Sequence, residues 1–238
     1  MKRTFLASAA TILLAALAPA PASAQEIELG ATAAAPLIAP VCPAGVSQAN
    51  CKIVLPEVTA LETIRAGVNY PTTVTKPGEI VAFTLGLSAL SSNKATVKSD
   101  IAFLDSSYGG SPQAEVTILR QVGKKSLRHW AVAAESSDFH LQPYLGQVVQ
   151  FPLTQPLPVV PGEVIAVTVP TWAPVLSIDL TPSKYAYRQS RKANCTVPPT
   201  SIQAQLTIGQ SAPYQCDYAG TRVEYSATEI TTPAPTAG

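Results

Sequence analysis

The stretch KPGEIVAFTL at residues 76–85 returns as VPGEVIAVTV at residues 160–169. Both copies hold Pro, Gly, Glu, Ala and Thr at the same positions, and two branched apolar residues follow the Glu in each. Pro presets φ at the second position of a turn, and Gly accepts the positive φ of the third. Each copy therefore predicts a turn that begins a central strand. Nothing outside these ten residues repeats convincingly, which favours an architectural role over a duplicated binding site.

Most other segments alternate between apolar and polar residues, which is the periodicity of a half-buried strand. The clearest examples are Leu176, Ile178 and Leu180, then Ala204, Leu206 and Ile208, and finally Val223, Tyr225 and Ala227. Weaker strands are expected at 62–66, 98–104, 114–122, 127–135, 146–152 and 184–191. Helix signals are scarce, and the 22 prolines fall mostly between these segments. The pattern predicts an all-β fold, an antiparallel two-sheet sandwich of jelly-roll-like form.

The first 24 residues have the three parts of a secretory signal peptide. Lys2 and Arg3 precede an apolar run over residues 4–18, and Ala22-Ser23-Ala24 is a cleavage site of small residues. We expect a signal peptide at 1–24, an extended Ala- and Pro-rich leader at 25–50, a β-sandwich domain at 51–230 and a flexible tail at 231–238. No later segment has the roughly 20 apolar residues of a spanning helix. The sequence therefore predicts a secreted, extracellular protein without membrane insertion.

The charge balance argues against partners that require a strong global field. The chain has 16 Lys and Arg residues against 15 Asp and Glu residues, and removal of Lys2 and Arg3 leaves 14 against 15. A protein this close to neutrality is not drawn to nucleic acid or to an anionic membrane surface. Only 13% of the residues are charged and 47% are hydrophobic, a composition that suits a packed core and excludes a disordered chain.

Four cysteines follow the signal peptide, and an even number in an exported chain predicts disulfides. Of the three possible pairings we favour Cys42–Cys51 with Cys195–Cys216, because each local pair closes a loop outside the strongest strand patterns. A zinc site is the alternative. The spacings are far from C-x-x-C and neither histidine lies near these cysteines, so we predict no metal ion and no cofactor.

Aromatic residues are the best candidates for a ligand site. Trp172 stands between two prolines that restrict its backbone, and Tyr185 and Tyr187 share one face of a strand with Arg188 on the other. Exposed rings of this kind stack on the faces of sugars, and Arg188 would hold hydroxyl or acidic groups. The alternative is that Trp172 closes one end of the sandwich and that the tyrosines face the core.

Titratable residues are weaker candidates for chemistry. His129 and His140 lie close enough in sequence to bind a metal ion or to supply a base, although surface polar contacts explain such histidines equally well. Paired carboxyl groups for glycoside hydrolysis can come from different strands. The possible members are Glu115, Glu135, Asp138 and Asp179, and no spacing singles out a pair. The nucleophile elbow G-x-S-x-G and a Gly-rich phosphate loop are both missing. We therefore predict no catalytic residue.

Four short motifs resemble a group of uncharacterised exported bacterial β-sandwich proteins. They are the two PGE turns, TVPTWAP at 168–174, YQCDY at 214–218 and RVEYSA at 222–227. The resemblance extends over residues 60 to 230 and implies the sandwich fold and export, without implying an activity. The chain also looks somewhat like carbohydrate-binding modules, which is an analogy of fold alone.

These observations lead to three hypotheses of function. The first is an exported, non-enzymatic binding or structural module that recognises saccharide or cell-envelope material. The second is a hydrolase of extracellular polysaccharide, with acids drawn from a face of the sandwich. The third is a subunit of a surface assembly, joined through an exposed strand edge or an apolar patch. Adjacent, exposed rings of Trp172, Tyr185 and Tyr187 would favour the first hypothesis.

The cysteine pairing can be tested on exported protein. Non-reduced digests analysed by mass spectrometry should contain no free cysteine and should contain the peptides joined by Cys42–Cys51 and by Cys195–Cys216. A substantial free-thiol fraction would contradict the expectation that all four cysteines are oxidised.

Overall fold

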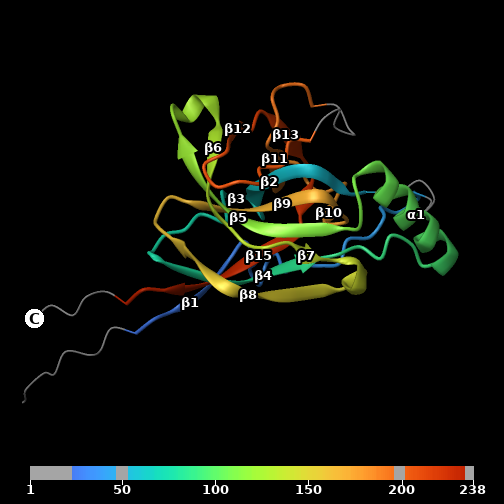
Figure 1. The fold of residues 1–238 in the computed structure, drawn as a ribbon, viewed down its shortest axis with the longest axis horizontal. Helices are drawn as coiled ribbons and strands as arrows, with labels where there is room; N and C mark the ends of the chain where they lie inside the picture. The colour runs from blue at the N-terminus through green and yellow to red at the C-terminus, as the bar shows by residue number, and fades with distance from the viewer. Residues whose placement is uncertain (1–22, 47–52, 196–201, 234–238) are drawn as a thin grey trace, which may run out of the picture.

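Two antiparallel sheets pack face to face in the computed structural model, which describes residues 23–46, 53–195 and 202–233 (Figure 1). The small sheet has the strand order β1 (Glu26–Leu29), β15 (Tyr225–Thr231), β4 (Gly78–Gly86) and β8 (Val148–Val159). The main path of the large sheet runs β12 (Ser211–Pro213), β6 (His129–Glu135), β5 (Gln113–Val122), β9 (Val164–Ala173), β2 (Leu55–Arg65), β11 (Tyr185–Gln189) and β13 (Cys216–Ala219). The predicted all-β antiparallel sandwich is confirmed, whereas its jelly-roll form is not.

Short elements complete the two layers. Strand β3 (Val68–Asn69) pairs with β2, β7 (Phe139–His140) pairs with β5, and β10 (Leu176–Ser177) pairs with β14 (Arg222–Val223). Among the described residues, the helical elements are α1 (Lys94–Ser107), which lies at one end of the sandwich, and the 3-10 turns η2 (Lys125–Leu127) and η3 (Gln142–Tyr144) (Figure 1).

The repeated phrase of the sequence begins one interior strand in each sheet. The first copy forms β4, between β15 and β8, and the second forms β9, between β5 and β2. Gly162 adopts the expected positive φ of 91°. Gly78 does not belong to the positive-φ residues, and a Cβ atom there would lie only 2.5 Å from the carbonyl oxygen of Ile230. The second glycine thus serves a turn, and the first permits close approach of a neighbouring strand.

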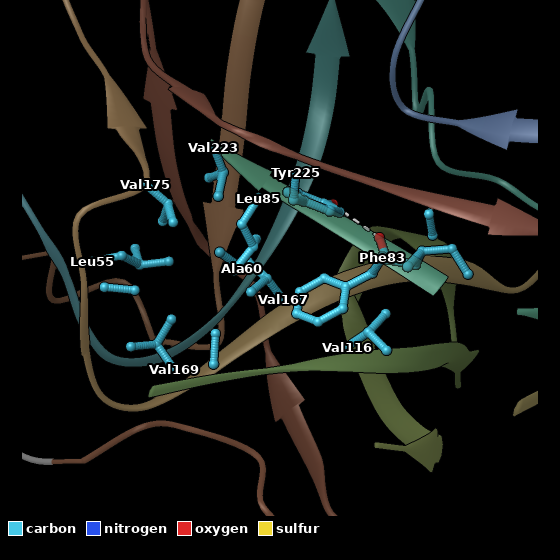
Figure 2. Close-up of a cluster of buried hydrophobic side chains, with 14 of the residues drawn as sticks. Leu55, Ala60, Phe83, Leu85, Val116, Val167, Val169, Val175, Val223 and Tyr225 are labelled. Carbon is cyan, nitrogen blue, oxygen red and sulfur yellow. Dashed lines mark hydrogen bonds between the residues drawn. The ribbon is translucent and has the colours of Figure 1, made fainter. Parts of the chain in front are cut away.

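The main core lies between the two sheets, where branched and aromatic side chains from both layers interdigitate (Figure 2). Phe83 and Leu85 of the small sheet face Val116 and Val167 of the large sheet. The register between β4 and β8 shifts between Ile80 and Ala82, so Ile80 is buried and the intervening residue is only half-buried. Apolar and polar residues therefore do not alternate strictly along β4, because a bulge changes which residues share a face.

A second, smaller cluster covers the outer face of the large sheet. Its members Val164 and Ala166 alternate along β9 with Ile165 and Val167 of the main core, so they point to the opposite side. Tyr214 packs into this cluster from the segment that precedes β13. Both faces of β9 are therefore buried, which explains its nearly continuous apolar sequence.

Two predicted strands have other structures, and the one expected from Leu176 to Leu180 is reduced to β10 (Leu176–Ser177). Residues 98–104 belong to helix α1, which begins after Asn93 because the Asn93 side chain accepts hydrogen bonds from the N–H groups of Ala95 and Thr96. Residues 203–208 form no strand and cross the outer face of the large sheet. There the Gln205 amide donates to the carbonyl groups of Trp130 and Gln210, so side-chain bonds replace a β ladder.

The leader is attached to the sandwich more firmly than the sequence suggested. Strand β1 pairs with β15, and the Arg222 guanidinium donates to the carbonyl oxygens of Ala35 and Pro36. The sandwich therefore begins at Glu26, not at residue 51. The expected signal peptide up to residue 22 and the tail from residue 234 lie outside the described residues, and β15 reaches Thr231.

One predicted disulfide is present. Cys195 and Cys216 are joined, with their Cα atoms 5.4 Å apart. The predicted pair Cys42–Cys51 stays a prediction, since Cys51 lies outside the described residues. Across the part of the chain that the structure describes, there is no helix with the length and apolarity needed to span a bilayer.

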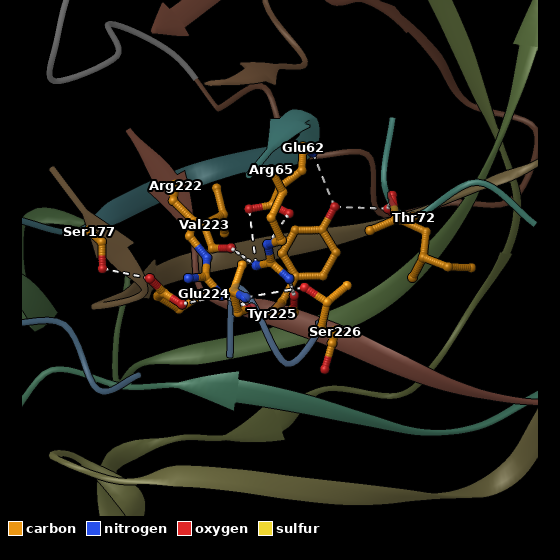
Figure 3. A network of polar contacts seen from close by, with 12 residues as sticks. Glu62, Arg65, Thr72, Ser177, Arg222, Val223, Glu224, Tyr225 and Ser226 are labelled. Atoms are coloured by element: carbon orange, nitrogen blue, oxygen red, sulfur yellow. Dashed lines mark hydrogen bonds and ion pairs between the residues drawn. The ribbon is translucent and has the colours of Figure 1, made fainter. Parts of the chain in front are cut away.

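A buried ion pair within β2 places a guanidinium at the contact between the two layers (Figure 3). The Arg65 Nε atom lies 2.9 Å from a Glu62 carboxylate oxygen, and the side chains of both residues are almost fully buried. The Arg65 Nη1 and Nη2 atoms also donate to the carbonyl oxygens of Tyr225 and Val223. These carbonyls flank the break between β14 and β15, where a guanidinium replaces strand partners.

The Tyr225 hydroxyl makes a second link between the layers. It donates to the Ile165 carbonyl on β9 and accepts a hydrogen bond from the Glu62 N–H on β2. Burial raises the pKa of the Glu62 carboxyl, while the positive charges of Arg65 and Arg222 oppose that rise. Desolvation opposes the charged form of Glu62 and the neighbouring cations favour it, so loss of either partner would leave the other buried without compensation.

Removal of the Arg65 guanidinium should be strongly destabilising. We expect Arg65→Met to lower the free energy of unfolding by about 3–5 kcal/mol, because it leaves the Glu62 carboxyl and two carbonyl groups without partners. The double variant Glu62→Gln/Arg65→Met should lose less than the sum of the two single variants. Urea unfolding of all four proteins measures both effects. A loss below about 1 kcal/mol for Arg65→Met would contradict the role given to this pair.

Candidate functional site: an aromatic pocket with a basic rim

A cavity of about 360 Å³ lies on the outer side of the large sheet. It is formed by the turn after β3, the β5–β6 hairpin and the turn before β9. Its lining residues are Tyr70, Thr73, Gln121, Lys125, Arg128, Trp130, Gly162 and Val164. The hairpin that supplies four of these residues projects beyond the rest of the large sheet (Figure 1). The pocket thus combines aromatic, amide, hydroxyl and cationic groups, a common composition of ligand sites.

Two aromatic rings define the apolar part of the pocket. The ring centroids of Tyr70 and Trp130 are 6.3 Å apart, and the planes are inclined by 38°. Trp130 belongs to the outer cluster and is only 6% exposed, whereas Tyr70 is 39% exposed. Burial of Trp130 holds one ring rigidly, and the other is available to solvent. A sugar ring stacks on such a surface because its C–H face matches the aromatic face in size and polarity.

The rim of the pocket is basic. Lys125 lies in η2, at the tip of the β5–β6 hairpin, and Arg128 follows directly after it. Both side chains are exposed, and neither forms an ion pair within the described ranges. A third cation is close, because Arg188 experiences the charge of Arg128 as well as the Tyr70 hydroxyl. These groups make the pocket locally positive, although the whole protein is nearly neutral.

Two of the lining residues have strained backbone conformations that hydrogen bonds hold in place. Tyr70 has a φ of 46° and Arg128 has a φ of 51°, and residues other than Gly seldom adopt such values. Hydrogen bonds secure both conformations. The Tyr70 N–H donates to the Thr63 carbonyl and the Arg128 carbonyl accepts from the Tyr214 N–H. Such strain persists where the surrounding structure imposes it, and it is concentrated at functional sites.

The aromatic platform expected from the sequence is not formed. Trp172 is fully buried, and its Nε1 atom donates to Asp105 Oδ1 and to the Gly110 carbonyl, each at 3.0 Å. Its ring packs against Leu104 of α1. Trp172 therefore closes the end of the sandwich beneath the helix, which is the alternative that the flanking prolines also allowed.

The tyrosines of β11 are also directed inward. Tyr187 is 3% exposed and stacks on Tyr218 at a centroid distance of 4.9 Å, while Tyr185 is half-buried near Arg222. Arg188 points to the other side, as expected from strand alternation, and forms an ion pair with Asp217. Of the four predicted ligand residues, only Arg188 lies near the aromatic pocket, and it is not one of the lining residues.

Sequence reasoning missed Tyr70 and Trp130 as a pair, because Tyr70 lies in the turn after β3 and Trp130 lies in β6, far along the sequence. A partial signal was present in RQVGKKSLRHW at residues 120–130, which places four cations within nine residues just before a tryptophan. A basic hairpin tip next to an aromatic residue would have indicated one half of the pocket. No local pattern points to Tyr70.

Three of the acids considered for hydrolysis come together elsewhere on the large sheet. Glu115 is 6% exposed, and its Oε1 atom has no hydrogen-bond partner. Burial raises the pKa of the Glu115 carboxyl to about 8, and the negative charges of Glu135 and Asp138 add to the rise. Glu135 lines a separate cavity of about 320 Å³, of which Glu115 is not a lining residue. Asp179 is exposed and does not contribute to the pKa shift of Glu115.

The histidines do not form a shared site. The His140 Nδ1 atom lies 3.4 Å from the Gln113 side-chain amide, and His129 is half-buried on β6. Over the described parts of the chain, no group of three or more His, Cys, Asp and Glu residues could hold a metal ion.

No protein-family model matches the chain, and no curated protein or solved structure is significantly similar to it. The resemblance to exported β-sandwich proteins therefore stays a prediction. Conclusions about function must come from the geometry of the pockets and from the sequence itself.

The buried Glu115 carboxyl predicts a specific pH dependence of stability. Because its pKa is raised above the usual 4.5 in the folded state, its favourable contribution is complete below pH 4.5 and is lost as the pH rises through about 8. Glu115→Gln should therefore stabilise the protein more at pH 9 than at pH 4. Thermal unfolding at both pH values measures the difference, with exposed Glu79→Gln on β4 as the control. An equal effect of Glu115→Gln at the two pH values would contradict the assignment.

Proposed function

We propose that the protein is an exported, non-enzymatic binding module that recognises saccharide at the pocket formed by Tyr70 and Trp130. The observation that carries the proposal is the pairing of a rigid ring with an exposed ring at the wall of a 360 Å³ cavity. Gln121 and Thr73 add an amide and a hydroxyl to the same wall. Stacking supplies affinity in such a site, and a few polar groups orient the hydroxyl groups of the sugar.

Export is part of the proposal. Its support comes from the signal-like N-terminus and from the Cys195–Cys216 disulfide, since disulfides persist in oxidising compartments. Saccharides of the cell envelope and of the extracellular matrix are abundant in that environment. A saccharide ligand is therefore compatible with the extracellular location that the disulfide and the signal-like N-terminus support.

Binding fits the structure better than the two alternatives. Glycoside hydrolysis needs two carboxyl groups that both reach the substrate. Of the three clustered acids, Glu135 lines a cavity, Glu115 is buried, and the exposed Asp138 is not one of the lining residues of that cavity. Assembly through a strand edge meets an obstacle at β8, an edge strand of the small sheet that contains Pro152, Pro156 and Pro158. Proline has no N–H to donate to an added strand, so these residues protect the edge from pairing.

The proposal can be tested with matched aromatic variants. The mature protein is titrated by calorimetry with a panel of neutral and acidic oligosaccharides, and the tightest ligand is then used with Tyr70→Ala. Loss of one stacking ring should weaken binding about tenfold. Tyr144→Ala is the control, because Tyr144 is 37% exposed, close to the 39% of Tyr70, and lies in η3 away from the pocket. Absence of binding across the panel, or equal losses in the two variants, would refute the proposed function.

A further inference from the structure

We infer that the pocket selects acidic saccharides, in which a pyranose ring carries a carboxylate. The inference rests on the proposed function and adds the charge of the ligand. It follows from the position of the two unpaired cations, Lys125 and Arg128, which line the same cavity as the rings of Tyr70 and Trp130. A neutral sugar would use only the rings and the uncharged polar groups, leaving the cations without a counterion.

The surrounding acids are already engaged, so they do not neutralise the rim. Glu163 is buried and forms an ion pair with Arg120, and its other carboxylate oxygen accepts from the Val160 N–H. Asp217 forms an ion pair with Arg188. Lys125 and Arg128 have no ion-pair partner in the described structure, and they therefore attract an anion from solution.

The chemistry of the two cations suits a carboxylate on a ring. The Arg guanidinium is planar and binds a carboxylate through two parallel hydrogen bonds, while the Lys ammonium group adds a point charge. In a uronic acid the carboxylate is attached at the edge of the sugar ring, so a ring stacked on an aromatic face places that group beside the stack. An aromatic wall with cations at its rim matches this arrangement, because it meets the apolar face and the charged edge of one residue together.

The backbone supports the same interpretation. Arg128 keeps a φ of 51° through the hydrogen bond from the Tyr214 N–H to its carbonyl, so the start of its side chain is fixed by the outer layer of the large sheet. The held backbone therefore directs the Arg128 side chain from a defined point on the rim. Arg188 is neutralised by its ion pair with Asp217, so the positive charge of the rim comes from Lys125 and Arg128.

The test compares ligands that differ only in charge. Tetragalacturonate and its fully methyl-esterified form have the same rings, but the ester removes the carboxylates. We expect the mature protein to bind the acid at least tenfold more tightly than the ester, and to lose that preference as salt screens the rim. Inorganic phosphate serves as an anion without a ring and should compete only weakly.

Matched charge variants locate the preference. Lys125→Gln and Arg128→Gln should each weaken binding of the acid about tenfold more than they weaken binding of the ester. Lys124→Gln is the control, because Lys124 is the adjacent exposed cation on the same hairpin but does not line the cavity. Thermal unfolding of each variant confirms that the fold is intact.

The outcomes separate this inference from the proposed function. Equal binding of acid and ester, with loss of both in Tyr70→Ala, would overturn the preference for acidic sugars and leave saccharide binding standing. An equal effect of Lys124→Gln and Arg128→Gln would show general electrostatic attraction and would also overturn it. If phosphate bound as tightly as tetragalacturonate, the aromatic rings of the pocket would contribute nothing to affinity, and the inferred selectivity for acidic saccharides would be overturned. Failure to bind any saccharide would overturn both proposals.

Discussion

The contact between the two sheets depends on the hydrogen bonds that the backbone carbonyl groups make at the break between β14 and β15. At that break the carbonyl groups of Val223 and Tyr225 face the interior, and an unpaired buried carbonyl is costly. The Arg65 guanidinium from the opposite sheet satisfies both carbonyls and is itself balanced by Glu62. The Tyr225 hydroxyl makes a further link between the sheets, because it donates a hydrogen bond to the Ile165 carbonyl of the large sheet. A polar network therefore sets the alignment of two surfaces that are otherwise held by nondirectional apolar packing.

This alignment has consequences on the other side of the large sheet. Ile165 lies next to Val164 on β9, so the strand that contacts the inner network also forms a wall of the aromatic pocket. Both faces of β9 are buried, which makes the strand a rigid support. The pocket is assembled on the outer face from turns and a hairpin, the elements that commonly carry binding residues above a fixed scaffold. The architecture thus separates stability, which resides between the sheets, from recognition, which we place on the outer face.

Sequence patterns located the strands better than they located the surfaces. Alternation identified β5 and β6, and the repeated phrase marked the interior strands β4 and β9, one in each sheet. The strand prediction failed over residues 98–104, which form part of α1. This helix has a weakly amphipathic sequence and is stabilised by the Asn93 cap and by tertiary contact through Leu104. It failed again over residues 203–208, where the Gln205 side chain takes the hydrogen bonds that a neighbouring strand would have taken.

The candidate site was the least predictable part. Trp172 and Trp130 both occur in apolar surroundings, and only tertiary packing decides that the first fills the end of the sandwich while the second forms the wall of a pocket. Tyr70 joins Trp130 across 60 residues of sequence through a turn with positive φ, a geometry that no short motif records. Exposure is a property of what packs on a residue, so local residue type cannot supply it.

The amino-acid sequence by itself determined the β class, the two interior strands that begin at the PGE phrases and the pairing of Cys195 with Cys216. Each of these follows from short-range constraints: the period of side chains along a strand, the φ angles of Pro and Gly, and the short loop that one disulfide closes. Tertiary structure alone decided which carbonyls Arg65 would satisfy, which tryptophan would be sealed beneath a helix, and which ring would meet the cations of the β5–β6 hairpin. Those outcomes depend on the relative placement of strands far apart in sequence, which arises only when the sheets pack.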